Sequence, residues 1–213
     1  MTELVFILDR SGSMSGLEMD TIGGFNSMLE KQRKETGEAV VSTVLFDHET
    51  TVIHDRMNIK KIKNLTEHDY YVRGSTALLD AVGKAIHHIG HVHKYARRED
   101  IPEKTLFIIT TDGMENASRY YTYEQVRHMI ERQQKRYGWQ FIFLGAHIDA
   151  VKEAKRFGID GTMAVNYHCD AEGTALNYEV ISEAITSVRK TATLSENWKA
   201  RIDEDYRNRG GKR

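Results

Sequence analysis

The sequence predicts an α/β domain with a doubly wound, mostly parallel central sheet, helices on both faces and one antiparallel edge strand. Two observations lead to this fold class. Short apolar runs alternate with helix-like segments along the whole chain. Several of these runs are apolar without interruption, which is typical of strands covered on both faces. The length of 213 residues is enough to bury one large core and favours one domain over two.

The first half of the chain shows the alternation element by element. Residues 4–8 form a continuous apolar run, which predicts a buried strand. A helix is expected at about 21–34, because apolar residues recur there on one helical face. The runs 39–46 and 50–54 flank the polar turn 47–49, so we expect a β-hairpin that supplies the antiparallel strand.

The second half repeats the pattern. A helix is expected from 76 to about 93, where the apolar residues recur at helical spacing. These residues are Leu79, Val82, Ile86 and Ile89. Further strands are expected at 105–111, 139–144 and 162–165, and further helices near 123–137, 150–157 and 171–189. In sheets of this kind, ligands bind beyond the carboxyl ends of the strands, near the point where the strand order reverses.

Composition and charge exclude several functional classes. The 30 basic and 31 acidic side chains leave no net field that would attract nucleic acid or a membrane, so we expect neither as a partner. Cys169 is the only cysteine, which rules out an internal disulfide and favours a reducing compartment. The first residues lack the pattern of a signal peptide, and no apolar run approaches the roughly 20 residues that cross a bilayer. We therefore expect a cytoplasmic protein.

The chain changes character after residue 190. We expect the α/β domain over 1–190 and a charged tail over 191–213. Apolar residues recur in this tail at four-residue spacing, at Leu194, Trp198, Ile202 and Tyr206. The spacing predicts a short amphipathic helix, which either docks back on its own domain or is presented to a partner. Docking on its own domain is the favoured alternative.

Five oxygen-bearing side chains occur in three separated places, each near the end of a strand-like run or just before a helix. They are Asp9, Ser11, Ser13, Thr76 and Asp112. Because parallel strands end at one edge of a sheet, the fold class itself can bring Asp9 and Asp112 together. Two carboxylates and three hydroxyls are hard donors that suit a small divalent cation, with Mg²⁺ first and Mn²⁺ or Ca²⁺ as alternatives. A cation held in this way can also take an anionic oxygen from a partner.

Other interpretations of these residues stay open at this point. Each side chain on its own could cap a helix or start a turn, and the domain could be a structural subunit. Asp9 could be the nucleophile of a Mg²⁺-dependent phosphohydrolase, but phosphatases of the haloacid-dehalogenase type need a second aspartate where this chain has Ser11. No nucleotide-binding motif occurs, and the residues around Ser13 do not form a nucleophile elbow. We therefore expect a binding module without catalytic residues, and not an enzyme.

The order and spacing of the five residues resemble the metal-ion-dependent adhesion site (MIDAS) of the von Willebrand factor A (VWA) domains, which include the integrin inserted domains. The family pattern is D-x-S-x-S, a distant Thr and a distant Asp that often precedes Gly, here Asp112-Gly113. The resemblance covers about residues 1–190 and retains all five positions. Without a signal peptide or disulfides, the chain is most similar to the stand-alone intracellular bacterial kind.

The resemblance implies a role for each of the five side chains. Ser11 and Ser13 would bind the metal directly, whereas Asp9, Thr76 and Asp112 would bind it directly or through water. An Asp or Glu side chain of a partner protein would take the open position. Intracellular relatives often work with ATPases or in stress and metal-resistance systems, which makes a component of such a system the expected partner. In the family, ligand engagement can also shift the last helix.

Four histidines occur close together, at His87, His88, His91 and His93. Two of them, His87 and His91, are separated by four residues and could share a transition metal on a helix. They fall on the same helical face as Asp80 and Lys84, opposite the apolar residues. We therefore expect a solvated helix face and not a metal site.

Five further residues lie in or near the motif. Arg10 occupies a variable position of the motif and could tune the charge that a ligand meets. Glu115 could support a metal ligand indirectly. His147 and Asp149 follow a strand at the same sheet edge and form either a rim that selects ligands or ordinary loop structure. Cys169 is expected to be a structural or surface thiol, because the sequence gives it no activating neighbours.

Overall fold

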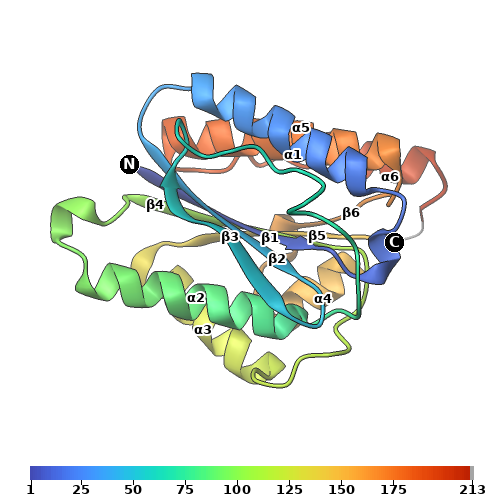
Figure 1. The fold of residues 1–213 in the computed structure, drawn as a ribbon, viewed down its shortest axis with the longest axis horizontal. Coiled ribbons are helices and arrows are strands. Elements are labelled where there is room, and N and C mark those ends of the chain that lie inside the picture. The colour runs from blue at the N-terminus through green and yellow to red at the C-terminus, as the bar shows by residue number, and fades with distance from the viewer. Residues whose placement is uncertain (212–213) are drawn as a thin grey trace.

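The computed structural model describes residues 1–211 and shows a six-stranded sheet between two layers of helices (Figure 1). The strands lie in the order β3-β2-β1-β4-β5-β6. Their bounds are β1 (Thr2–Asp9), β2 (Ala39–Phe46), β3 (Thr50–Asn58), β4 (Lys104–Thr111), β5 (Gln140–Gly145) and β6 (Ala164–Asn166). β3 pairs antiparallel with β2 at one edge, and the other neighbouring strands pair in parallel. The predicted fold class is confirmed.

The helices alternate with the strands and cover both faces of the sheet. Their bounds are α1 (Glu18–Lys34), α2 (Leu78–Tyr95), α3 (Tyr123–Tyr137), α4 (Ala150–Arg156), α5 (Ala171–Thr191) and α6 (Ala200–Asn208). Figure 1 shows α1, α5 and α6 along one face, and α2, α3 and α4 along the other. None of the helices in residues 1–211 combines the length and apolar character that crossing a membrane requires.

Strand β1 supplies core side chains to both layers. Leu4, Phe6 and Leu8 belong to the cluster under α1 and α5. Val5 and Ile7 belong to the cluster under α2 and α3. All five are at most 1% exposed. This burial on two faces explains why residues 4–8 are apolar without interruption instead of alternating with polar residues.

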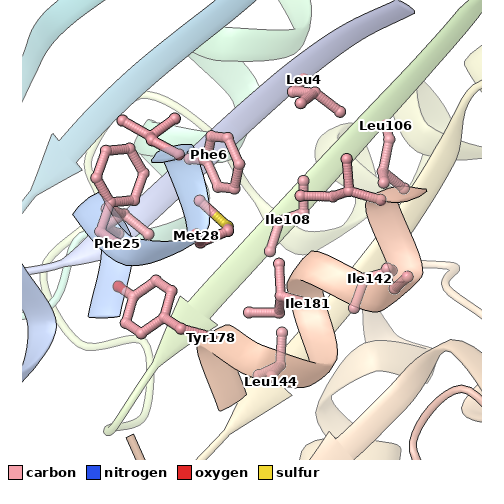
Figure 2. Close-up of a cluster of buried hydrophobic side chains, with 14 of the residues drawn as sticks. Leu4, Phe6, Phe25, Met28, Leu106, Ile108, Ile142, Leu144, Tyr178 and Ile181 are labelled. Carbon is pink, nitrogen blue, oxygen red and sulfur yellow. The ribbon is translucent and has the colours of Figure 1, made fainter. Parts of the chain in front are cut away.

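Figure 2 shows the cluster that α1 and α5 share with the sheet. The ring of Phe25 in α1 packs edge-on against Phe6, with centroids 5.2 Å apart, and against Tyr178 in α5, with centroids 6.3 Å apart. Beyond this apolar contact, the Gln32 side chain of α1 donates hydrogen bonds to the backbone carbonyl and hydroxyl of Ser182 in α5. The two helices are therefore held side by side by both kinds of contact.

Some elements begin or end at residues other than those expected. α1 begins at Glu18, a turn earlier than the apolar pattern indicated. α2 begins at Leu78 because Thr76 belongs to the loop before this helix. There the Thr76 carbonyl accepts hydrogen bonds from the backbone N–H groups of residues 116–117, in the loop after β4. β6 is only three residues long, since Gly161–Met163 forms a 3₁₀ turn ahead of it.

The strand order reverses between β1 and β4. The chain starts at β1, adds β2 on one side and places β4 on the other side. Doubly wound sheets bind ligands at the carboxyl ends of the strands beside such a reversal. Asp9 is the last residue of β1, and Asp112 directly follows β4. The topology thus puts both aspartates at the expected position.

The segment after α5 packs against its own domain. Trp198 is 8% exposed and Ile202 is 1% exposed, and both belong to the cluster under α1 and α5. The Trp198 indole N–H donates to the carbonyl of Thr162 at 3.0 Å. Of the two arrangements considered for the amphipathic helix, the structure shows the docked one. Residues 212–213 of the tail lie outside the described residues.

Candidate metal centre

The carboxylate of Asp9 is held in place from two sides. The backbone N–H of Ser11 donates to Oδ1 at 2.7 Å, and the Thr111 hydroxyl donates to Oδ2 at 2.7 Å. The backbone carbonyl of Asp9 accepts a hydrogen bond from the Tyr70 hydroxyl at 2.5 Å. Asp9 itself is only 2% exposed. Each carboxylate oxygen keeps a further lone pair for a water molecule or a cation.

The loop after β1 brings two hydroxyls to Asp112. Ser13 Oγ donates to Asp112 Oδ1 at 2.6 Å, and Ser11 Oγ lies 3.5 Å from the same oxygen. The two hydroxyl oxygens are 3.1 Å apart. A 3₁₀ turn at Gly12–Met14 curves the loop enough to point both side chains in this direction. Three donor atoms therefore lie within hydrogen-bonding distance of one another.

Thr76 reaches the same place from the loop before α2. The two loops touch, because the Gly12 N–H donates to the Gly74 carbonyl at 3.1 Å. A Cβ atom placed on Gly113 would lie 3.6 Å from Thr76 Oγ1 and 3.8 Å from Ser13 Oγ, so both hydroxyls lie beside this glycine. The structure thus brings together all five oxygen-bearing residues that the sequence singles out.

The two aspartates of this cluster are short of positive charge. Burial, opposed by hydrogen bonds from Ser11 and Thr111 and reinforced by the charge of Asp112, raises the pKa of Asp9 from 3.8 to about 6. Burial also raises the pKa of Asp112. Among residues 1–211, no lysine or arginine forms an ion pair with either carboxylate. A divalent cation between them would supply the missing charge and favour the ionised forms.

Arg10, which lies inside the motif, points away from the cluster. Its Nε atom pairs with Asp47 Oδ2 at 2.8 Å, and its terminal nitrogen donates to Thr51 Oγ1 at 2.9 Å. The Arg10 side chain is 2% exposed and that of Asp47 is 0% exposed. A buried carboxylate needs a paired cation, and Arg10 meets this need in the hairpin turn. The expectation that Arg10 tunes the charge met by a ligand is therefore wrong.

Glu115 and Asp80 both accept hydrogen bonds from backbone N–H groups near the start of α2. Glu115 Oε2 accepts from the Leu79 N–H at 2.8 Å, so this carboxylate fixes the first turn of the helix. Asp80 accepts from three successive N–H groups at 119–121. Asp80 is 4% exposed, so its assignment to a solvated helix face is wrong. The sequence pattern could not show the distant loop that covers it.

The histidines of α2 differ in burial. His87 and His91 are exposed, as expected for a solvated face. His93 is half-buried and lies 2.6 Å from the carboxylate of Glu3. Within residues 1–211, no group of three or more potential metal ligands includes a histidine of this helix.

His147 and Cys169 lie next to the cluster. His147 Nδ1 is 3.3 Å from the backbone oxygen of Asp112, and Cys169 Sγ is 4.0 Å from Asp112 Oδ2. Burial raises the pKa of Cys169 to about 12, which keeps the thiol protonated near neutral pH in the metal-free protein. Asp149 instead caps α4 by accepting from the Lys152 N–H at 2.9 Å. His147 thus forms part of the rim, whereas Asp149 is an ordinary helix cap.

Sequence reasoning missed three residues of this region. Thr111 and Cys169 carried a usable signal, because they stand at the carboxyl end of β4 and just after β6, on the same sheet edge as Asp9. Tyr70 carried none, since it comes from the irregular segment between β3 and α2.

Solved structures place this fold among known proteins, although no family model and no curated protein sequence matches the chain. A mussel byssus protein, proximal thread matrix protein 1 with a zinc-occupied MIDAS motif, is 14% identical with a TM-score of 0.58, covering 87% of this chain and 46% of that chain. The ArnB paralog VWA2 from Sulfolobus acidocaldarius is 20% identical with a TM-score of 0.55, covering 86% and 44%. A von Willebrand factor type A protein from Catenulispora acidiphila is 13% identical with a TM-score of 0.56, covering 87% and 42%.

The chain has the fold of a von Willebrand factor A domain. It spans less than half the length of each of these three proteins. The resemblance indicated by the D-x-S-x-S motif is confirmed at the level of the fold.

Proposed function

We propose that this protein is a metal-dependent protein-binding module. A divalent cation held by Asp9, Ser11, Ser13, Thr76 and Asp112 would take an Asp or Glu side chain of a partner protein at its open position. The observation that carries this proposal is the pair of buried carboxylates that no lysine or arginine of residues 1–211 neutralises. Two carboxylates and one dication sum to about zero charge, and the hydroxyls complete coordination without adding charge.

The exposure of the cluster supports access by a partner. Ser13 is exposed, whereas Asp9 and Asp112 are buried, so a cation would be approached from the Ser13 side. Met114 follows Asp112 by two residues and is 63% exposed. Exposed methionine side chains adapt to different partner surfaces and are frequent where proteins bind one another. A partner that inserts a carboxylate here would also find an apolar contact.

Mg²⁺ is the ion proposed first, with Mn²⁺ and Ca²⁺ as alternatives, because all three prefer oxygen ligands. The mussel structure, with its zinc-occupied MIDAS motif, supports a divalent cation at a site of this class. The partner proposed from the resemblance is a cytoplasmic component of an ATPase, stress or metal-resistance system. The formal net charge of −1 offers no support for nucleic acid or a membrane as the partner.

The surroundings of Asp9 favour binding over catalysis. A nucleophilic aspartate must present one oxygen to the substrate. Asp9 is only 2% exposed, and hydrogen bonds from Ser11 and Thr111 hold its carboxylate inside the protein. Position 11, where a phosphatase of the aspartyl class carries its acid, is a serine. We therefore propose no enzymatic activity.

Titration calorimetry with Mg²⁺ and Mn²⁺ tests the metal site. We expect Asp112→Ala and Ser13→Ala to lower the affinity for the metal ion at least about tenfold. Even the loss of a residue that only hydrogen-bonds to a metal ligand typically costs about that factor. Asp149→Asn is the matched control, since this exposed helix cap lies at the same sheet edge outside the cluster. Equal affinities in all four proteins would contradict the proposal.

Two further assays separate binding from catalysis. Proteins retained by the wild type in Mg²⁺, but lost in EDTA and with Asp112→Ala, would meet the expectation for a carboxylate partner. In a screen with phosphate esters, we expect no hydrolysis by the wild type that is absent from Asp9→Asn. Such turnover would replace the binding module with the phosphohydrolase alternative.

A further inference from the structure

A second set of metal-binding atoms adjoins the oxygen cluster. It consists of Asp112, His147 and Cys169, which follow β4, β5 and β6 respectively. One ligand atom from each residue lies within 4.8 Å of the other two. Three successive parallel strands therefore each contribute one donor at the same edge of the sheet.

The two oxygens of Asp112 face different donor sets. Oδ1 accepts from Ser13 at 2.6 Å and lies near Ser11, within the set of hard oxygens. Oδ2 lies 4.0 Å from Cys169 Sγ. His147 contacts the backbone of the same residue, with Nδ1 3.3 Å from the carbonyl oxygen. Asp112 thus stands between an all-oxygen set and a set that contains sulfur and nitrogen.

The chemistry of the second set differs from that of the first. Carboxylate, imidazole and thiolate together suit Zn²⁺, whereas Mg²⁺ takes oxygen ligands and has little affinity for sulfur. A tetrahedral zinc ion with bonds of about 2.0–2.3 Å separates its donors by roughly 3.5 Å. The spacing seen here therefore needs only small side-chain rotations to close around such an ion.

The loop that carries Cys169 is held by the docked tail. His168 Nε2 lies 3.2 Å from the backbone oxygen of Tyr206, and Asp170 forms an ion pair with Arg209. Asp170 also accepts from the Gly173 N–H at 2.8 Å at the start of α5. Cys169 is thus fixed from both sides, which lowers the ordering cost of binding a metal.

The other close group of potential ligands, at Asp47, His48 and Glu49, does not share these features. Asp47 Oδ2 is already paired with Arg10 at 2.8 Å and with Arg73 at 2.9 Å. Two cationic partners leave no charge on this carboxylate to attract a metal ion. In the part of the chain described, only the group around Asp112 combines oxygen, nitrogen and sulfur donors with a carboxylate that forms no ion pair with lysine or arginine.

We propose that the protein also binds Zn²⁺, through Asp112, His147 and Cys169, with water or a partner carboxylate as the fourth ligand. Binding releases the thiol proton of Cys169 to solvent, because a coordinating sulfur is a thiolate. Zn²⁺ and Mg²⁺ then compete, since both use Asp112. The inference rests on the proposed function only through Asp112, which both sites share. Mg²⁺ would be surrounded by the oxygen donors, and Zn²⁺ by Asp112, His147 and Cys169.

Substitution with Co²⁺ tests the inference through a spectroscopic signal that needs no partner. A cobalt–thiolate bond gives strong near-ultraviolet charge-transfer absorption, which oxygen ligands do not give. Under reducing conditions we expect this band in the wild type and in Ser13→Ala, and its loss in Cys169→Ser. We also expect Cys169→Ser and His147→Asn to lower Zn²⁺ affinity by about 100-fold or more, since losing an outer partner alone costs up to that factor.

The same proteins separate failure of this inference from failure of the proposed function. Mg²⁺ affinity should be reduced in Ser13→Ala, which keeps the thiolate band. His91→Asn is the matched control, because this exposed histidine lies on α2 away from the site. If Co²⁺ gives no thiolate band while Mg²⁺ binds as proposed, the zinc site alone is overturned. A thiolate band in a protein that binds no Mg²⁺ overturns the oxygen site alone.

Discussion

Ser13 Oγ donates a hydrogen bond to Asp112 Oδ1 at 2.6 Å, across 99 positions of sequence. The contact joins the loop after β1 to the end of β4, which are neighbouring strands only because the sheet order reverses between them. In a metal-bound protein the same two oxygens would face the cation and not each other. The hydrogen bond therefore marks where the cation is expected and keeps the donors close together before it arrives.

The metal-free protein should lose stability as pH rises through the acid range. The pKa of Asp9 is about 6 in the folded protein against 3.8 for the unfolded reference. Between these values the folded protein binds more protons than the unfolded chain, so the free energy of unfolding falls as pH increases and stays low above pH 6. At about 1.36 kcal/mol per pKa unit, the contribution of Asp9 is roughly 3 kcal/mol.

Urea unfolding in EDTA at several pH values measures this dependence. Saturating Mg²⁺ at pH 7.5 should reverse the loss, since a ligand at 100 times its dissociation constant stabilises by about 2.7 kcal/mol. The lowered pKa of His54 acts in the opposite direction over this range, so the wild type is compared with Asp9→Asn. The same pH dependence in both proteins would disagree with the buried state of Asp9.

Asp9→Asn should stabilise the metal-free protein at pH 7.5 while removing its response to Mg²⁺. The amide removes a buried negative charge, and its two polar groups can still hydrogen-bond with the Ser11 N–H and the Thr111 hydroxyl. We expect a gain of about 1–3 kcal/mol at pH 7.5 and little change at pH 4. Thermal unfolding with and without Mg²⁺ checks both parts. A variant that is destabilised at pH 7.5 would show that Asp9 serves the fold and not the cation.

Two buried threonines of similar exposure should respond oppositely to removal of the hydroxyl. Thr174 in α5 is 5% exposed, and its hydroxyl has no hydrogen-bond partner in the described structure. Thr111 is 0% exposed and donates to Asp9. Thr174→Val should be neutral or stabilising by up to about 1 kcal/mol, whereas Thr111→Val should cost about 1–3 kcal/mol. The urea midpoints of the two variants compare them directly. Equal losses of stability would argue against the difference in hydrogen bonding between the two hydroxyls.

Arg10→Met should be strongly destabilising, although Arg10 lies inside the metal-binding motif. Removing Arg10 takes away the buried partner of Asp47 and leaves this buried carboxylate with only the 36% exposed Arg73, at a cost of about 3 kcal/mol. Arg73→Met is the control, because Arg73 pairs with the same carboxylate but is 36% exposed, and this variant should lose clearly less stability. Urea unfolding measures both variants. Similar decreases in the free energy of unfolding would mean that Arg10 stabilises Asp47 no more than Arg73 does.

The strands and helices could be predicted because their apolar patterns are local. Leu4 to Leu8 are apolar without interruption since both faces of β1 are covered, and the sequence shows this directly. The edge hairpin followed from a polar turn between two apolar runs. The start of β6 could not be predicted, because a 3₁₀ turn capped by Asp160 replaces the first half of the expected strand.

The candidate site was predictable where its residues stand at strand ends, and not where they depend on distant loops. Asp9 and Asp112 were found because each follows an apolar run. The burial of Asp80 depends on a loop about 40 positions away, and that of Arg10 on Asp47 in the hairpin turn. Neither contact can be recognised from neighbouring residues in the sequence. Because Asp80 and Arg10 are charged, the sequence indicated exposure for both. Cys169, in contrast, could have been included in the site, because it stands just after β6 at the same sheet edge as Asp9.

A crystal structure with Mn²⁺, analysed by anomalous scattering, tests the central claim most directly. We predict one strong peak among the oxygens of Ser11, Ser13 and Asp112, with Thr76 and Asp9 bound directly or through water. In Asp112→Ala crystals grown under the same conditions, that peak should disappear while the fold stays unchanged. A wild-type crystal whose manganese lies elsewhere, with these oxygens still bonded only to one another, would contradict the account.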